Sequence, residues 1–117
     1  MEHVEFITTE SGDDLIVSFA LSQGEPGEIR SLILLRTPKY EIFFDEFERG
    51  VSFSDEDCMD EEDRLRSIEI LQNVIHLRTL RRDYILDIHG IDRKELKRAE
   101  KVLRKMNFDH AFELRIS

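Results

Sequence analysis

Tryptophan is absent from this 117-residue chain, and cysteine occurs once, as Cys58. A single thiol can neither close a disulfide within the chain nor build a zinc site of several cysteines, and such scarcity is typical of a reducing compartment. The five glycines and two prolines are scattered, without a glycine-rich stretch. Because phosphate-binding loops require clustered glycines, the sequence predicts no nucleotide-binding loop.

Long hydrophobic runs are also missing. No stretch approaches the roughly eighteen apolar residues that a membrane helix needs, and the first ten residues are acidic where a secretion signal is basic. We therefore expect a soluble, cytoplasmic protein with no membrane partner. Hydrophobic residues make up 40% of the chain and recur in short patterned runs, which favours a folded domain over disorder. The length predicts one domain over residues 1–117.

Negative charge is in excess, and it is unevenly placed. Residues 1–63 hold 18 acidic and 4 basic side chains, a net charge of −14, whereas residues 64–117 hold 8 acidic and 13 basic side chains, a net charge of +5. Together they give the formal net charge of −9. Phosphate backbones repel an acidic protein, so nucleic acid is disfavoured as a partner, and the first half is expected to meet a cationic protein.

The first forty-odd residues are patterned as strands. Alternating apolar and β-branched residues predict strands at 3–9, 15–21 and 29–36, and ESGDD and QGEPGE supply the turns between them. A fourth strand is predicted at 40–44, where Tyr, Ile and Phe alternate with Glu and Phe. These four strands predict an antiparallel meander.

Residues 60–82 fit two different structures. As a helix, the segment has acids in its first turn and arginines in its last. As a hairpin, it has β-branched residues on both sides of a turn at Gln72 and Asn73. The sequence favours the hairpin and leaves the helix open.

The C-terminal part predicts a strand at 83–89, a helix from Asp92 to Met106 with Asp92 as its N-cap, and a last strand in FELRIS. Asn107 is expected to end the helix in a left-handed turn. The apolar stripe of the helix consists of Leu96, Ala99, Val102, Leu103 and Met106. The predicted fold class is α+β: a single domain with a mainly antiparallel sheet (a meander), a covering C-terminal amphipathic helix and a final C-terminal strand.

Residues suited to metal or catalytic chemistry lack the spacing that such sites require. The four histidines show no HxH or HExxH pattern, and the acidic run fails the EF-hand calcium pattern because Asp60 stands where glycine is needed. We predict no metal, no cofactor and no enzymatic activity. Asp87 and His89 share one face of a predicted strand, which leaves a small enzyme using that pair as an alternative.

Aromatic and acidic residues are interleaved between positions 40 and 63. Five rings fall within fourteen residues, and seven acids occupy the nine positions 55–63. One strand face cannot bury all of these rings, so some are expected at the surface beside carboxylates, where they suit a partner rich in Lys and Arg. The predicted partner-binding residues are Phe43, Asp45, Glu46, Phe47, Glu48, Asp55, Glu56, Asp57, Asp60, Glu61, Glu62 and Asp63.

The predicted C-terminal helix carries seven basic residues against Glu95 and Glu100. They either form a solvated face that balances the acidic half, or contact an acidic protein or a nucleic acid. The sequence leaves both interpretations open.

Three stretches between Tyr40 and Met106 resemble the small immunity proteins that bacteria make against the toxins of polymorphic and contact-dependent systems. They are YEIFFDEFERGV, ILQNVIHLRT and YILDIHGIDRKELKRAEKVLRKM. The resemblance implies a non-enzymatic protein that binds and blocks one cognate toxin.

The leading hypothesis is therefore a small acidic protein-binding module, an immunity-type inhibitor that occludes a cationic surface such as the active site of a nuclease toxin. A nucleic-acid mimic, encoded by a phage or mobile element and directed against a defence nuclease, is an alternative with the same charge. The enzyme based on Asp87 and His89 is an alternative of another class.

Overall fold

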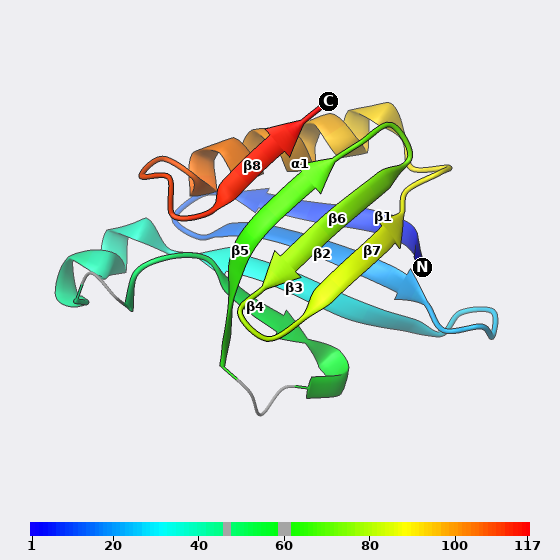
Figure 1. Cartoon of the computed structure of the whole chain (residues 1–117), viewed down its shortest axis with the longest axis horizontal. Coiled ribbons are helices and arrows are strands. Elements are labelled where there is room, and N and C mark those ends of the chain that lie inside the picture. The colour runs from blue at the N-terminus through cyan, green and yellow to red at the C-terminus, as the bar shows by residue number, and fades with distance from the viewer. Residues whose placement is uncertain (46–47, 59–61) are drawn as a thin grey trace.

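The computed structural model describes residues 1–45, 48–58 and 62–117 of the chain (Figure 1). The strands of this described part are β1 (Glu2–Ser11), β2 (Leu15–Ser22), β3 (Ile29–Arg36), β4 (Ser52–Asp55), β5 (Asp63–Ile70), β6 (Val74–Thr79), β7 (Asp83–Asp87) and β8 (Glu113–Ile116). Its helices are α1 (Arg93–Met106) and the short 3-10 helices η1 (Pro38–Phe43) and η3 (Glu56–Cys58).

Strands β1 to β7 follow an up-and-down path in which each pairs antiparallel with the next. β7 then pairs with β1, where Glu2 lies opposite Leu86 and His3 opposite Asp87. Because an odd number of alternating strands ends in the direction in which it began, this pairing is parallel. β8 adds to β5 as a second parallel pair. The predicted α+β class is confirmed in outline, and the sheet is mixed rather than purely antiparallel.

The sheet folds over into two layers that enclose the core. Figure 1 shows β5, β6 and β7 crossing in front of β1, β2 and β3, with α1 along the upper edge beside β8. The helix packs against β1 and β2, and the pairing of β4 with β5 joins the layers on the other side. Side chains from both layers and from α1 are fully buried between them, among them Phe19, Leu34, Leu77, Leu86 and Leu103.

The predicted C-terminal helix is confirmed as α1. The Asp92 carboxylate accepts a hydrogen bond of 2.8 Å from the backbone N–H of Lys94, which satisfies one of the free donors of the first turn. The predicted apolar stripe faces the core, with Leu96 half-buried and the others buried. Asn107 does not adopt the predicted left-handed conformation, since its φ is −96°; His110, three residues later, does so with a φ of 56°.

The ambiguous segment is a hairpin, so the helical alternative is wrong. β5 and β6 pair antiparallel with Ile68 opposite Leu77, and the backbone N–H of Leu71 donates to the carbonyl of Val74 at 2.8 Å to close the turn. The predicted last strand is also confirmed, as β8, with Leu114 and Ile116 half-buried.

The strand predicted at 40–44 is wrong, because the chain there forms η1. Pro38 stands in the first turn, where its fixed φ suits a helix and its missing N–H costs nothing. The Glu41 side chain points inward and accepts hydrogen bonds from the buried Arg36. A strand over these residues would not have to turn Glu41 inward. The sequence reasoning also missed β4, a four-residue strand in the polar stretch SFSD.

No helix among residues 1–45, 48–58 and 62–117 is long and apolar enough to cross a membrane.

Leu103 tests the role of α1 in the core, since it is 0% exposed. Its replacement by alanine should lower the free energy of unfolding by about 2–5 kcal/mol, because a cavity remains where the side chain packed. The control Leu80→Ala removes an exposed side chain and should change the free energy by less than about 0.5 kcal/mol. Urea denaturation followed by circular dichroism measures both. An unchanged midpoint for Leu103→Ala would contradict the packing of α1 on the sheet.

Candidate protein-binding surface

The η1 segment presents apolar side chains to solvent. Phe43 is 82% exposed and Ile42 is 75% exposed, and Tyr40 and Phe44 are also exposed. With about three residues per turn, a 3-10 helix turns one side chain inward while its neighbours point away. Here Glu41 is the inward residue. The exposed apolar residues around it, Tyr40, Ile42, Phe43 and Phe44, are called the η1 cluster, and η1 lies at one end of the molecule (Figure 1).

Arg36, at the end of β3, holds η1 in place from inside the protein. The side chain is 1% exposed, and its guanidinium forms two hydrogen bonds of 2.8 Å to each of two carboxylates, those of Glu41 and Asp109. A further N–H donates to the carbonyl of Met106 at 2.6 Å. All five guanidinium N–H groups therefore have acceptors. The ring of Phe108 lies 4.3 Å from the guanidinium carbon, within cation–π range.

The charged forms of Arg36 and Asp109 stabilise each other. Burial disfavours a charged guanidinium, but the hydrogen bonds to Asp109 and Glu41 outweigh that effect and raise the pKa of Arg36. In return, the Arg36 hydrogen bond holds the pKa of Asp109 below its usual value, against the opposing effect of burial. The guanidinium of Arg36 is thus held between the carboxyl groups of Glu41 and Asp109.

Two of the predicted carboxylates follow η1 in the chain. Asp45 and Glu48 are exposed, two and five residues after its end, and Phe43 belongs to the cluster itself. Glu56, Asp57 and Glu62 are also exposed, but they lie around η3 and before β5. The predicted residues Glu46, Phe47, Asp60 and Glu61 lie outside the described residues.

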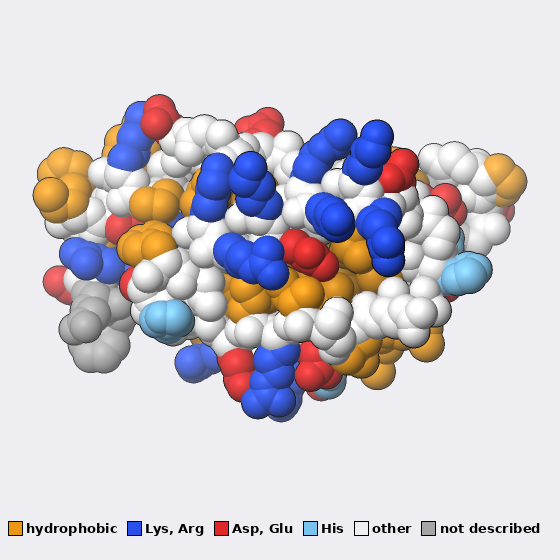
Figure 2. Space-filling view, turned by 90° about the horizontal axis from the view of Figure 1, so that it is seen from above, with side chains coloured by type: hydrophobic (Ala, Val, Ile, Leu, Met, Phe, Trp, Pro, Cys, Tyr) orange, Lys and Arg blue, Asp and Glu red, His pale blue; other side chains and the backbone are white. Residues whose placement is uncertain are grey.

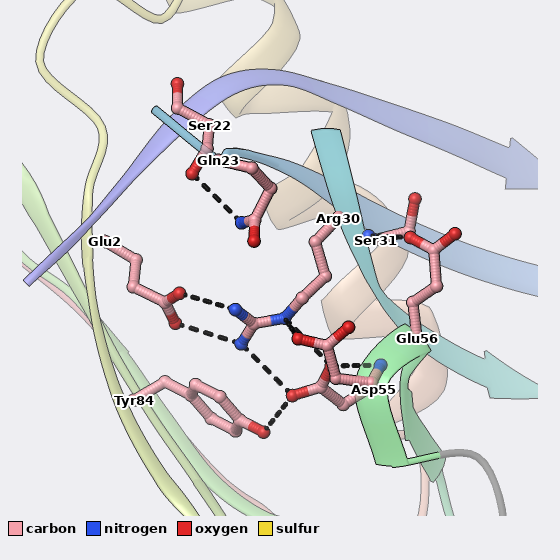
Figure 3. A network of polar contacts seen from close by, with 9 residues as sticks. Glu2, Ser22, Gln23, Arg30, Ser31, Asp55, Glu56 and Tyr84 are labelled. Carbon is pink, nitrogen blue, oxygen red and sulfur yellow. Dashed lines mark hydrogen bonds and ion pairs between the residues drawn. The ribbon is translucent and has the colours of Figure 1, made fainter. Parts of the chain in front are cut away.

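Asp55 lies inside the protein, where it holds strands together, and not on its surface as predicted. Its carboxylate is 4% exposed and accepts hydrogen bonds from the Arg30 Nε at 2.9 Å and the Tyr84 hydroxyl at 2.8 Å (Figure 3). Arg30 also donates to Glu2 at 2.8 Å. These contacts join β1, β3, β4 and β7. The sequence does not distinguish Asp55 from the other acids of its run, so its role as a buried hydrogen-bond acceptor was missed.

The hydrogen bonds to Asp55 decide its ionisation. Burial alone would raise the pKa of this carboxyl. The backbone N–H of Asp57 and the side chains of Arg30 and Tyr84 donate to the charged form, and together they hold the pKa below its usual value. Burial, and then the Asp55 carboxylate, raise the pKa of the Tyr84 phenol, which remains the donor of the pair.

Asp63 is the second predicted surface carboxylate that is buried. It accepts hydrogen bonds from the Thr79 hydroxyl at 2.7 Å and from the backbone N–H groups of Arg64 at 2.8 Å and Arg81 at 3.2 Å. These bonds fasten the start of β5 to the turn after β6. Asp55 and Asp63 are therefore structural residues at the two ends of the acidic run.

The alternative catalytic pair has a different partner from the predicted one. The Asp87 carboxylate lies 3.1 Å from the Nδ1 atom of His3 and accepts a hydrogen bond of 2.9 Å from the backbone N–H of His89. That backbone bond and then His3 hold the pKa of Asp87 below its usual value. In the described part of the chain, no Ser, Thr, Cys or Tyr side chain hydrogen-bonds to either imidazole.

Metal ligands are not gathered either: in residues 1–45, 48–58 and 62–117, no group of three or more His, Cys, Asp and Glu side chains is arranged to hold an ion. Comparison with protein-family models, curated proteins and solved structures found no match to the chain. Function is therefore inferred from the surface chemistry, in which the anchored apolar cluster of η1 beside Asp45 and Glu48 is the main feature.

Arg36 can be tested by two substitutions that differ in shape and charge. Arg36→Ala leaves two carboxylates without their cation and should lower the free energy of unfolding by about 3–5 kcal/mol. Arg36→Lys keeps the charge but cannot donate to two carboxylates in a planar fork, so it should restore only part of that loss. Chemical denaturation of both variants and the wild type measures the effect. Full recovery in Arg36→Lys would show that charge alone is needed.

The low pKa values of Asp55 and Asp109 predict acid sensitivity. A carboxyl whose pKa is lower in the folded protein stabilises the fold above its unfolded pKa, and that contribution is lost as the pH falls through the folded value. Stability should therefore decline below about pH 3.8, the ordinary pKa of aspartate. Asp55→Asn should be less stable at neutral pH and decline less steeply in acid. A decline as steep as that of wild type in denaturation series at several pH values would contradict the assignment to Asp55.

Proposed function

We propose that the protein is a non-enzymatic binding module that attaches to a cationic partner protein through η1. The observation that carries the proposal is the exposure of Ile42 and Phe43 on a segment that Arg36 fixes from beneath. A segment held in one conformation loses little conformational entropy on binding, which favours affinity. Asp45 and Glu48 beside it supply the charge that attracts a partner rich in Lys and Arg.

Phe43 supplies enough apolar surface to act as an anchor. An aromatic side chain buries about 150–250 Å² at an interface, and at about 25 cal/mol per Å² the exposed part of Phe43 corresponds to about 3–5 kcal/mol before the costs of association. Ile42 adds to it on the same segment. A few residues of this kind dominate the binding energy of most interfaces.

An immunity-type inhibitor is the specific form that we propose. It is supported by the resemblance of the stretches between Tyr40 and Met106, by the acidic first half and by an apolar anchor suited to a matching pocket. Such a protein acts by covering a basic surface of its toxin, which needs steric occlusion and no chemistry of its own. The burial of Asp55 and Asp63 leaves fewer carboxylates to imitate a row of phosphates, so the nucleic-acid mimic is not favoured.

The anchor is tested by Phe43→Ala. Affinity captures with the wild-type protein, with Phe43→Ala and with Ile85→Ala should yield one partner that Phe43→Ala fails to retain. Ile85→Ala is the control, because Ile85 is exposed on β7, away from η1. Binding of that partner, once identified and purified, should weaken about tenfold or more in Phe43→Ala, mainly through faster dissociation. Equal binding by all three proteins would place the interface elsewhere.

The charges are tested separately by reversing Asp45 and Glu48 to Lys. Association with the same partner should slow, and its dependence on salt should become shallower, because exposed charges steer the encounter and are screened beyond about 8–10 Å. Stopped-flow mixing at low and high ionic strength measures both effects. Association as fast as that of wild type at low salt would show that these carboxylates do not face the partner.

A further inference from the structure

A hollow of about 800 Å³ lies beside the first half of α1. The turn between β5 and β6, the loop before α1 and the helix itself enclose it. Its lining is mixed: Ile70, Ile88, Ile91 and Leu96 are apolar, Gln72, Asn73, Glu100 and Ser117 are polar, and Arg93 and Lys97 carry positive charge. Figure 2 looks onto this side of the molecule and shows an apolar strip bordered by Lys and Arg side chains. This feature is the α1 hollow.

All seven Lys and Arg side chains of α1 are exposed. In the described part of the chain, none of the seven Lys and Arg side chains of α1 forms an ion pair. Arg30, Arg36 and Lys39 of the acidic half, by contrast, are all paired with carboxylates. Glu100 also lines the hollow, so the excess of positive charge lies along α1 as a whole, where seven Lys and Arg side chains stand against Glu95 and Glu100. Among the described residues, the basic face of α1 thus does not balance the acidic half through ion pairs.

We infer that the α1 hollow takes the η1 cluster of a second copy of this chain. The η1 cluster exposes Ile42 and Phe43 and is followed in the chain by the exposed carboxylates of Asp45 and Glu48, which suits a hollow with apolar residues in its wall beside the basic face of α1. In the contact, Ile42 and Phe43 enter the hollow, and the two carboxylates face Arg93 and Lys97. Both halves of this interface are surfaces of the same molecule.

The arrangement of the two surfaces makes the contact intermolecular. η1 projects at the left end of Figure 1, whereas the β5–β6 turn and the start of α1 lie at the upper right. The longest extent of the molecule, 43 Å, runs horizontally in this view. One copy therefore cannot fill its own hollow. Two copies can be joined by two reciprocal contacts in an antiparallel two-fold dimer, or by a single contact that leaves one hollow and one η1 cluster open and so continues into chains or larger rings.

Self-association would cover the same η1 cluster that we propose for the cationic partner, and in that respect it rests on the proposed function. A small interface of this kind is weak. The fraction of self-associated protein therefore rises with protein concentration and falls when a partner that binds η1 more tightly is present. The two uses of η1 would exclude each other. Residues of the α1 hollow serve self-association alone.

The test is the mass distribution of the purified protein in sedimentation velocity, over a range of concentrations at low and at high ionic strength. We expect dimers and longer species at low salt and fewer at high salt. Phe43→Ala removes the anchor and Lys97→Glu reverses one positive charge of the hollow, so each variant should weaken association about tenfold or more. Lys101→Glu is the matched control, since Lys101 is an exposed residue of α1 outside the hollow and undergoes the same charge change.

Mixing the two defective variants distinguishes this contact from other modes of association. Lys97→Glu retains an intact η1 cluster, and Phe43→Ala retains an intact hollow, so a mixture should form one-to-one dimers and nothing larger. A symmetric contact between identical surfaces would not be rescued in this way. Circular dichroism checks that both variants are folded, which is expected because both substitutions affect exposed side chains.

Three results would overturn the inference: monomers at every concentration of the wild type, association that Lys97→Glu leaves unchanged, or a mixture that remains monomeric. The proposed function is tested apart from it, because Lys97→Glu should still bind the cationic partner. Loss of self-association with partner binding retained would leave the proposed function standing. If Lys97→Glu abolishes self-association and no cationic partner depends on Phe43, the proposed function fails and self-association remains as the role of η1.

Discussion

Arg36 places a positive charge in the protein interior, and several elements are arranged around the need to satisfy it. A buried cation is costly unless its charge is paired and its N–H groups are accepted, and Arg36 meets both conditions through Glu41, Asp109 and the Met106 carbonyl. These acceptors come from η1, from the end of α1 and from the loop after it. The arginine therefore determines where η1 lies and which of its residues face outward. Because Glu41 must point in, Ile42 and Phe43 are left in solvent.

Sequence reasoning was accurate where side-chain periodicity and helix capping report directly on local structure. The strands near both ends of the chain, the hairpin of β5 and β6, and α1 with its Asp92 cap were all foreseen in this way. It failed where a contact distant in sequence decides the local conformation. The alternation in residues 40–44 fits a strand, but the pairing of Glu41 with Arg36 and the proline at 38 favour a 3-10 helix. The candidate surface was foreseen in part: Phe43, Asp45 and Glu48 are exposed, whereas Ile42 was not among the expected contacts.

The acidic character of the first half has two separate physical roles. Three of the carboxylates are buried: those of Asp55, Asp63 and Glu41. They accept hydrogen bonds that join strands and helices. Asp45, Glu48, Glu56, Asp57 and Glu62 are exposed, and their charge acts on whatever approaches the molecule. Composition cannot separate the two groups, because a buried and an exposed aspartate are identical letters in a run such as DEDCMDEED. The separation follows from where a donor such as Tyr84 or Thr79 lies in the fold, which depends on strand register.

α1 connects the two surfaces of the molecule. Its C-terminal end supplies the Met106 carbonyl to the cluster that fixes η1, and its N-terminal half forms one wall of the α1 hollow. At about 1.5 Å per residue, the 14 residues of the helix separate these ends by about 20 Å. The buried stripe of the helix on β1 and β2 holds both ends to the same rigid core. A substitution that shifts α1 on the sheet would therefore disturb η1 and the hollow together, whereas changes of exposed residues at either end act on one surface at a time.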